Sequence, residues 1–146
     1  MVADKKDGKV LVDSRLDVKV LLAGLWVVLM FFYLYCDFFA LYKSGAIQLM
    51  MDGFMGPFPV SQGALFSGSL LMIIPACMVF LSLSVHARIN RWLNIVAGLA
   101  YTLVGIGNII GETMIFYIVF VILEWAVTIS IVALSVKWPR RQTENS

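Results

Sequence analysis

The segment Met114–Val136, MIFYIVFVILEWAVTISIVALSV, is apolar throughout except for one acidic residue, Glu124, close to its centre. An α-helix rises about 1.5 Å per residue, so a helix of this length can cross the roughly 30 Å hydrocarbon core of a bilayer. A charged carboxylate at that depth costs several kcal/mol, unless it faces protein or water or is protonated. The segment therefore predicts a transmembrane helix whose acid is sheltered by the rest of the chain.

The composition extends this prediction to the whole protein. Hydrophobic residues make up 61% of the 146 residues and charged residues 14%, whereas soluble domains average about half and a quarter. The sequence predicts one all-α domain, residues 1–146, built as an integral membrane four-helix bundle with up-down connectivity. The four predicted helices cover approximately residues 15–42, 63–85, 91–111 and 114–137.

Local signals mark the ends of these helices. Ser14 followed by Asp17 resembles a capping box that starts the first helix, and Ser61 is a plausible cap for the second. Pro75 predicts a kink inside the second helix, because proline removes a backbone hydrogen bond that a neighbouring group must replace. The link HARINR, residues 86–91, is short, so the second and third helices form an antiparallel hairpin.

Residues 43–62 form the only long connection between predicted helices. The stretch combines glycine and proline breakers with methionine and phenylalanine, and it is too apolar for a freely solvated loop. We predict an outward interfacial loop, as a re-entrant segment or a short helix on the membrane surface, that partly covers the open end of the bundle. Both an apolar plug and a moving gate are compatible with this composition.

The distribution of basic residues predicts the orientation. Lysine and arginine gather at the two termini and at the HARINR link, whereas Lys43 is alone on the other side. Under the positive-inside rule this bias predicts a multi-pass protein of the cell membrane with cytoplasmic N and C termini. The modest net charge of +2, carried at segment ends, argues against a nucleic-acid partner. The residues on the predicted cytoplasmic side are Lys5, Lys6, Lys9, Arg15, Lys19, Arg88, Arg91, Lys137, Arg140 and Arg141.

Small and polar residues recur at helical spacing in the third helix. Intervals of three and four residues place them on one face. Gly98 and Gly105 in this series allow a neighbouring helix to approach closely, and Gly107 with Gly111 forms a GxxxG pair on an adjoining face. Packing explains these glycines without any ligand. The series comprises Asn94, Gly98, Tyr101, Gly105, Asn108 and Glu112.

Depth along the helices predicts which polar groups meet. Tyr33, Tyr101 and Glu124 fall near the middle of the membrane, whereas Asp37 and Asn108 lie toward the outside. We predict that these five residues form an outward-facing, ligand-binding polar pocket floored by Glu124. The alternatives are a neutral Glu124 that only hydrogen-bonds Tyr101 or Tyr33 across helices, and a Glu124 that lies at an oligomer contact.

These features favour a non-enzymatic membrane protein. The sequence contains no nucleophile–base pair, metal-ligand cluster or phosphate loop, so we predict no catalytic residues, no metal site and no cofactor. The first hypothesis is a binding protein for a small-molecule or lipid-like ligand, with the lipid bilayer as its surroundings. The alternatives are a proton-coupled small transporter that works as a homo-oligomer, and an accessory or scaffold subunit of a membrane complex.

Two stretches carry a family resemblance. They are LWVVLMFFYLYCDFFALY, residues 25–42, and LLMIIPACMVFLSLSVHARINRWLNIVAGL, residues 70–99. With Glu124, they resemble a family of uncharacterised four-helix bacterial and archaeal membrane proteins, a domain of unknown function. The most specific features are Tyr33-x-x-x-Asp37 and the sequence NRWxN at residues 90–94.

The resemblance covers residues 16–139 and implies the fold and the membrane location, but no catalytic residue. In that family an acidic residue often precedes Ile-Pro in the second helix, where this chain has Ile73. In broad shape the chain also resembles DoxX-like four-helix proteins, a likeness that implies no function.

Overall fold

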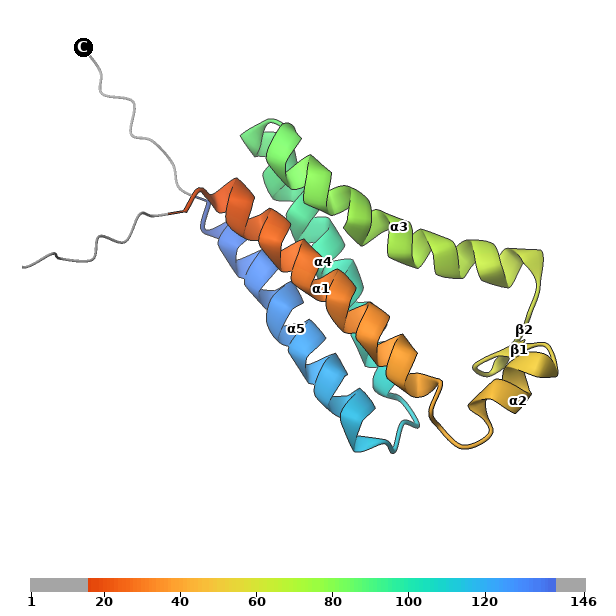
Figure 1. Ribbon diagram of the computed structural model, residues 1–146. Helices are drawn as coiled ribbons and strands as arrows, with labels where there is room; N and C mark the ends of the chain where they lie inside the picture. Colours follow the sequence, from red (N-terminus) through yellow and green to blue (C-terminus); the bar gives the residue numbers. More distant parts are fainter. Residues whose placement is uncertain (1–15, 139–146) are drawn as a thin grey trace, which may run out of the picture.

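Four long helices dominate the computed structural model, which describes residues 16–138 (Figure 1). All four are long and apolar enough to cross a membrane, which confirms the prediction of a mostly helical protein with four helices of this kind. The two ends of the described chain lie at one end of the bundle, together with the turn between α3 and α4. The long helices are α1 (Val18–Ala40), α3 (Gln62–Ser84), α4 (Ala87–Ile109) and α5 (Ile115–Val136).

The N-caps of α1 and α3 agree with the local sequence signals. Asp17 is the N-cap of α1 and accepts a hydrogen bond from the backbone N–H of Lys19 at 2.7 Å. Ser61 caps α3 and accepts from the N–H of Ala64 at 3.1 Å. Ser14, predicted as part of a capping box, lies outside the described residues.

Helix α4 begins and ends earlier than predicted, at Ala87 rather than residue 91 and at Ile109 rather than residue 111. The predicted link is mostly the first turn of this helix, because the N–H of Asn90 already bonds the carbonyl of His86 at 2.9 Å. At the other end Gly111 has a φ of 80°, a left-handed conformation that glycine adopts without steric cost. Gly111 therefore belongs to the turn before α5, and the predicted GxxxG pair does not lie within one helix.

The long connection after α1 folds into a small unit of its own. It contains the short helix α2 (Ala46–Met51) and a hairpin of β1 (Phe54–Met55) with β2 (Phe58–Pro59). Figure 1 places this unit beside the first turn of α3, well apart from the turn between α4 and α5. The short helix α2 is one of the two forms predicted for this segment, and the interfacial position stays a prediction.

The helices pack in the spatial order α3, α1, α5, α4. Helix α1 lies between α3 and α5, and α5 packs closely along α4, whereas α3 and α4 have few contacts. Figure 1 shows that the first half of α3 leans away from the other helices. The bundle is consequently open between the first half of α3 and the other three long helices.

Pro75 lies inside α3, as the sequence predicts. Because proline has no N–H, the carbonyl of Leu71, four residues earlier, has no donor within the helix. The hydroxyl of Tyr101 on α4 donates a hydrogen bond to this carbonyl at 2.7 Å. This bond joins the leaning helix to α4 at mid-height.

The glycines of α4 allow close packing against α5. A Cβ added at Gly98 would lie 2.7 Å from a methyl carbon of Val132, and one at Gly105 only 2.5 Å from the indole nitrogen of Trp125. Both distances are too short for real carbon contacts, so these positions require glycine, as predicted. At both positions the nearest atom belongs to a side chain, and at Gly98 a backbone atom, the carbonyl oxygen of Thr128, also lies 3.4 Å from the added Cβ.

Buried amides hold the end of the bundle that contains the α3–α4 turn. The Oδ1 atom of Asn94 accepts from the indole N–H of Trp26 at 2.7 Å, and its amide group donates to Asn90. Asn90 in turn donates to the carbonyl of Ser82 at 2.6 Å. All four side chains are fully buried, so this network links α1, α3 and α4 in the half of the bundle that contains the α3–α4 turn.

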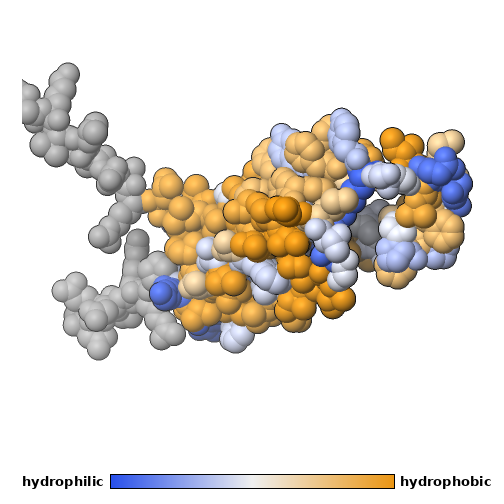
Figure 2. All heavy atoms as spheres, turned by 90° about the horizontal axis from the view of Figure 1, so that it is seen from below, coloured by the Kyte–Doolittle hydropathy of each residue, from blue (hydrophilic) through white to orange (hydrophobic). Residues whose placement is uncertain are grey.

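The outer surface of the bundle is largely apolar. Figure 2 shows hydrophobic side chains over most of the visible face of the helices, with the most hydrophilic atoms toward the two ends of the molecule, including the loop unit. Large hydrophobic residues such as Leu34, Phe66 and Ile115 are more than 60% exposed. A surface of this kind suits hydrocarbon rather than water.

Candidate functional site

One cavity of about 170 Å³ lies between the four long helices. It combines carboxyl, phenol and amide groups with a few apolar side chains. Its walls come from α1, α3, α4 and α5, so it exists only when all four helices are assembled. The lining residues are Tyr33, Cys36, Asp37, Leu71, Met72, Tyr101, Val104, Asn108, Tyr117 and Glu124.

All five predicted site residues line this cavity. Tyr33, Tyr101 and Glu124 are buried, with exposed fractions of 6%, 4% and 2%. Asp37 and Asn108 lie near the C-terminal ends of α1 and α4 and are exposed. The cavity therefore has a buried floor and a polar mouth directed away from the end that holds the chain termini.

Glu124 makes no hydrogen bond with any other described residue. Its Oε2 atom and the hydroxyl of Tyr33 are both buried without a partner within residues 16–138. Tyr101, the other predicted partner, donates instead to the Leu71 carbonyl. The alternative in which Glu124 is satisfied by one of these tyrosines does not occur in this structure. A buried polar atom without a partner is costly, so the floor of the cavity presents two groups able to bind a ligand.

The ionisable groups that line the cavity include carboxyl groups but no basic side chain of the described residues. Its lining contains two carboxyl groups, Asp37 and Glu124, and none of the described lysine, arginine or histidine side chains. Lys43 lies close to this lining, with its ammonium group 4.7 Å from the ring centroid of Tyr117. Lys43 is already paired with Glu112 at 2.5 Å, so it does not neutralise the carboxyl groups of the cavity.

The pair of Lys43 and Glu112 joins the end of α1 to the turn between α4 and α5. Oε1 of Glu112 also accepts from the backbone N–H groups of Thr113 and Met114, at 3.0 and 2.9 Å. Slight burial alone would raise the pKa of Glu112, but the Lys43 ammonium and the two N–H groups hold this pKa below its usual range. A charged clasp beside the cavity mouth therefore joins the helices at the end of the bundle opposite the chain termini.

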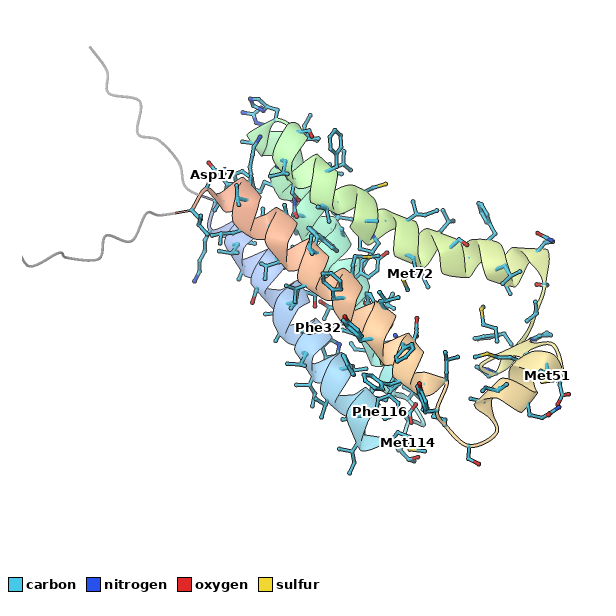
Figure 3. All side chains as sticks on the ribbon, in the orientation of Figure 1. Asp17, Phe32, Met51, Met72, Met114 and Phe116 are labelled. Atoms are coloured by element: carbon cyan, nitrogen blue, oxygen red, sulfur yellow. The ribbon has the colours of Figure 1, made fainter. Side chains whose placement is uncertain are left out.

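Sequence reasoning missed part of the lining. Cys36 lies three residues after Tyr33, so a count along that face would have found it. The interval of seven residues already predicts that Tyr117 shares a face with Glu124, but Tyr117 was not among the five predicted site residues. Leu71 and Met72 gave no signal, because α3 is apolar on all sides and its sequence does not indicate which face turns inward. Figure 3 shows Met72 on the side of α3 that faces the other helices.

The four helices and the enclosed polar cavity define a class: a small four-helix protein of the membrane-spanning type. Residues 11–145 match a family of unknown function (DUF6326), and the chain belongs to this family. The family resemblance stated from the sequence is thereby confirmed. No curated protein and no solved structure matches the chain. The function must therefore be argued from the cavity.

Proposed function

We propose that this chain is a non-enzymatic, multi-pass protein of the cell membrane that binds a small or lipid-like ligand in the cavity above Glu124. The observation that carries the proposal is the pair of unpartnered groups on the cavity floor, Oε2 of Glu124 and the hydroxyl of Tyr33. Intramembrane acids that face an internal cavity are typical of ligand and ion sites. A ligand with hydrogen-bonding groups would satisfy both atoms at once.

The size of the cavity sets the scale of the bound group. A water molecule takes about 30 Å³ in the liquid, and the cavity measures about 170 Å³. This volume suits a group of a few non-hydrogen atoms. The ligand is therefore either a very small molecule or the polar end of a larger one.

The proposed orientation has both termini in the cytoplasm and the cavity mouth outside. Lys19, Arg88 and Arg91 all lie at the end that contains the α3–α4 turn, and Lys19 Nζ donates to the carbonyl of Val85 there at 2.8 Å. Lys43 is at the opposite end, in its pair with Glu112. This asymmetry supports the orientation expected from the positive-inside rule.

Co-purified compounds test the proposal. The protein is purified in a mild detergent, extracted with organic solvent, and compared by mass spectrometry with Glu124→Gln and Glu112→Gln. We expect a compound enriched with the wild type and with Glu112→Gln, a carboxyl outside the cavity, but lost from Glu124→Gln. Circular dichroism verifies that both variants are folded. Identical compounds in wild type and Glu124→Gln would overturn the proposal, as would the absence of any enriched compound.

A proton-coupled transporter working as a homo-oligomer is the second candidate. The observation in its favour is that Glu124 is a single, deeply buried carboxyl without a fixed partner, so it is free to take up and release a proton. This candidate predicts proton flux across protein-containing liposomes under a pH gradient, with loss of flux in Glu124→Gln. A monomeric protein without such flux would remove the transporter and leave the binding proposal intact.

A further inference from the structure

A second, larger hollow adjoins the polar cavity. It is a groove of about 550 Å³ between α1 and α3, on the side where α3 leans away from the other long helices. The two hollows share two lining residues, Asp37 and Met72. The groove residues are Val27, Met30, Phe31, Leu34, Asp37, Met72, Ala76 and Val79.

The two hollows differ in chemistry. Except for Asp37, every residue of the groove is apolar, whereas the cavity holds the carboxyl of Glu124 and the free hydroxyl of Tyr33. Phe31 and Leu34, on the wall of the groove, are 50% and 62% exposed. The groove is therefore open sideways, toward the region that lipid occupies in the proposed orientation.

Dimensions and charge together indicate the occupant. From Val27 to Asp37 the groove follows α1 for about 15 Å, the extended length of a chain of roughly a dozen methylene groups. The cavity that adjoins Asp37 presents two carboxyl groups, and its lining contains no described cation. A head with positive charge and several N–H donors complements this lining.

We propose that the cavity and the groove form one site for a single-chain amphiphile with a primary-amine head. The head lies between Asp37 and Glu124, and the tail lies in the groove between α1 and α3. The ligand enters sideways from the outer half of the bilayer. This inference rests on the proposed function, because it names the ligand class for the same cavity.

The two parts of the ligand contribute differently. Lipid tails are as apolar as the groove, so moving the tail from bilayer to groove gains only packing. Discrimination between ligands therefore comes from the head, through the carboxyl groups. The tail determines whether the amine is delivered to the cavity along the groove.

Binding of dodecylamine tests the inference. Purified protein in a nonionic detergent is titrated with dodecylamine, dodecanol and dodecanoate, which each carry a twelve-carbon chain, and one-to-one complexes are counted by native mass spectrometry. Ligand is expressed as a mole fraction of detergent, so that partition into micelles is equal for all protein variants. We expect dodecylamine to bind at least tenfold more tightly than the other two, and Glu124→Gln with Asp37→Asn to abolish this preference.

A bulky residue in the groove tests the position of the tail. Ala76→Trp fills the groove and is expected to weaken dodecylamine binding at least tenfold. Ile73→Trp is the matched control, because Ile73 lies on the same helix, is 52% exposed and lines neither hollow. It should bind dodecylamine like the wild type. Circular dichroism establishes that both variants are folded.

The outcomes separate the two proposals. If Ala76→Trp binds dodecylamine as well as Ile73→Trp does, the groove is not the tail site and this inference fails, while a loss in Glu124→Gln would still support the proposed function. Equal binding of the three amphiphiles would also overturn the inference, because the carboxyl groups would then not select an amine. If Glu124→Gln and Asp37→Asn change neither dodecylamine binding nor the co-purified compounds, both proposals fail.

Discussion

The hydroxyl of Tyr101 replaces a backbone donor that α3 lacks, so Tyr101→Phe should be costly. Pro75 leaves the Leu71 carbonyl without a donor in its own helix, and Tyr101 supplies one at 2.7 Å. Leaving such a group unsatisfied costs about 1–3 kcal/mol, whereas interhelical hydrogen bonds in membranes average about 0.6 kcal/mol. We therefore expect Tyr101→Phe to lower the free energy of unfolding by about 1–2 kcal/mol.

Two further variants isolate the cause of this loss. Tyr33→Phe removes the same atom from another buried tyrosine of the cavity, but that hydroxyl has no partner, so we expect a change below about 0.5 kcal/mol. Pro75→Ala restores the missing N–H of α3, so in this background Tyr101→Phe should also cost less than about 0.5 kcal/mol.

Unfolding by sodium dodecyl sulfate in mixed micelles, followed by circular dichroism, measures these free energies. An equal loss in Tyr33→Phe, or an undiminished cost of Tyr101→Phe beside Pro75→Ala, would refute the pairing of the hydroxyl with the freed carbonyl. The first result would assign the loss to the removal of any tyrosine hydroxyl from the cavity. The second would assign it to contacts of Tyr101 other than the Leu71 carbonyl.

Three other predictions follow from the packing, the charged clasp and the orientation. Gly105→Ala should destabilise the protein by about 1–3 kcal/mol because its Cβ would overlap an indole ring. Gly107→Ala has nothing within 4 Å of its Cβ and should stabilise the protein slightly. The same unfolding assay compares the two variants. The pKa of Glu112 is lowered by its partners, so wild type should be more stable than Glu112→Gln above the ordinary carboxyl pKa of 4.5. This difference in stability should vanish as the pH falls below the lowered pKa. Unfolding measured between pH 7 and pH 3 tests this, and a difference that stayed constant would contradict it. In a cysteine-free background, Ser44→Cys should react with a membrane-impermeant thiol reagent on intact cells and His86→Cys should not; the reverse pattern would invert the proposed orientation.

Several features of the fold could be predicted from single stretches of sequence. The apolar segment around Glu124, for example, is long enough to span a bilayer, and length and hydrophobicity are properties that each segment carries by itself. Helix faces were predictable for a similar reason: Gly98, Tyr101 and Gly105 recur at intervals of three and four residues, and all three are buried. The turn after α4 was harder to predict from the sequence. The spacing of Gly107 and Gly111 predicts a pair within one helix, but Gly111 has a left-handed conformation and lies in the turn.

The sequence by itself determined the number of long helices and five of the polar residues that line the cavity, because periodicity and depth depend only on the spacing of residues along a helix. Only the tertiary structure decided how those residues are partnered: Tyr101 bonds a carbonyl freed by a proline on another helix, and Glu124 and Tyr33 are left without partners. The groove between α1 and α3 was also found only in the structure. Because α3 is apolar on all sides, its sequence does not predict which face packs against the other helices or how far the helix leans.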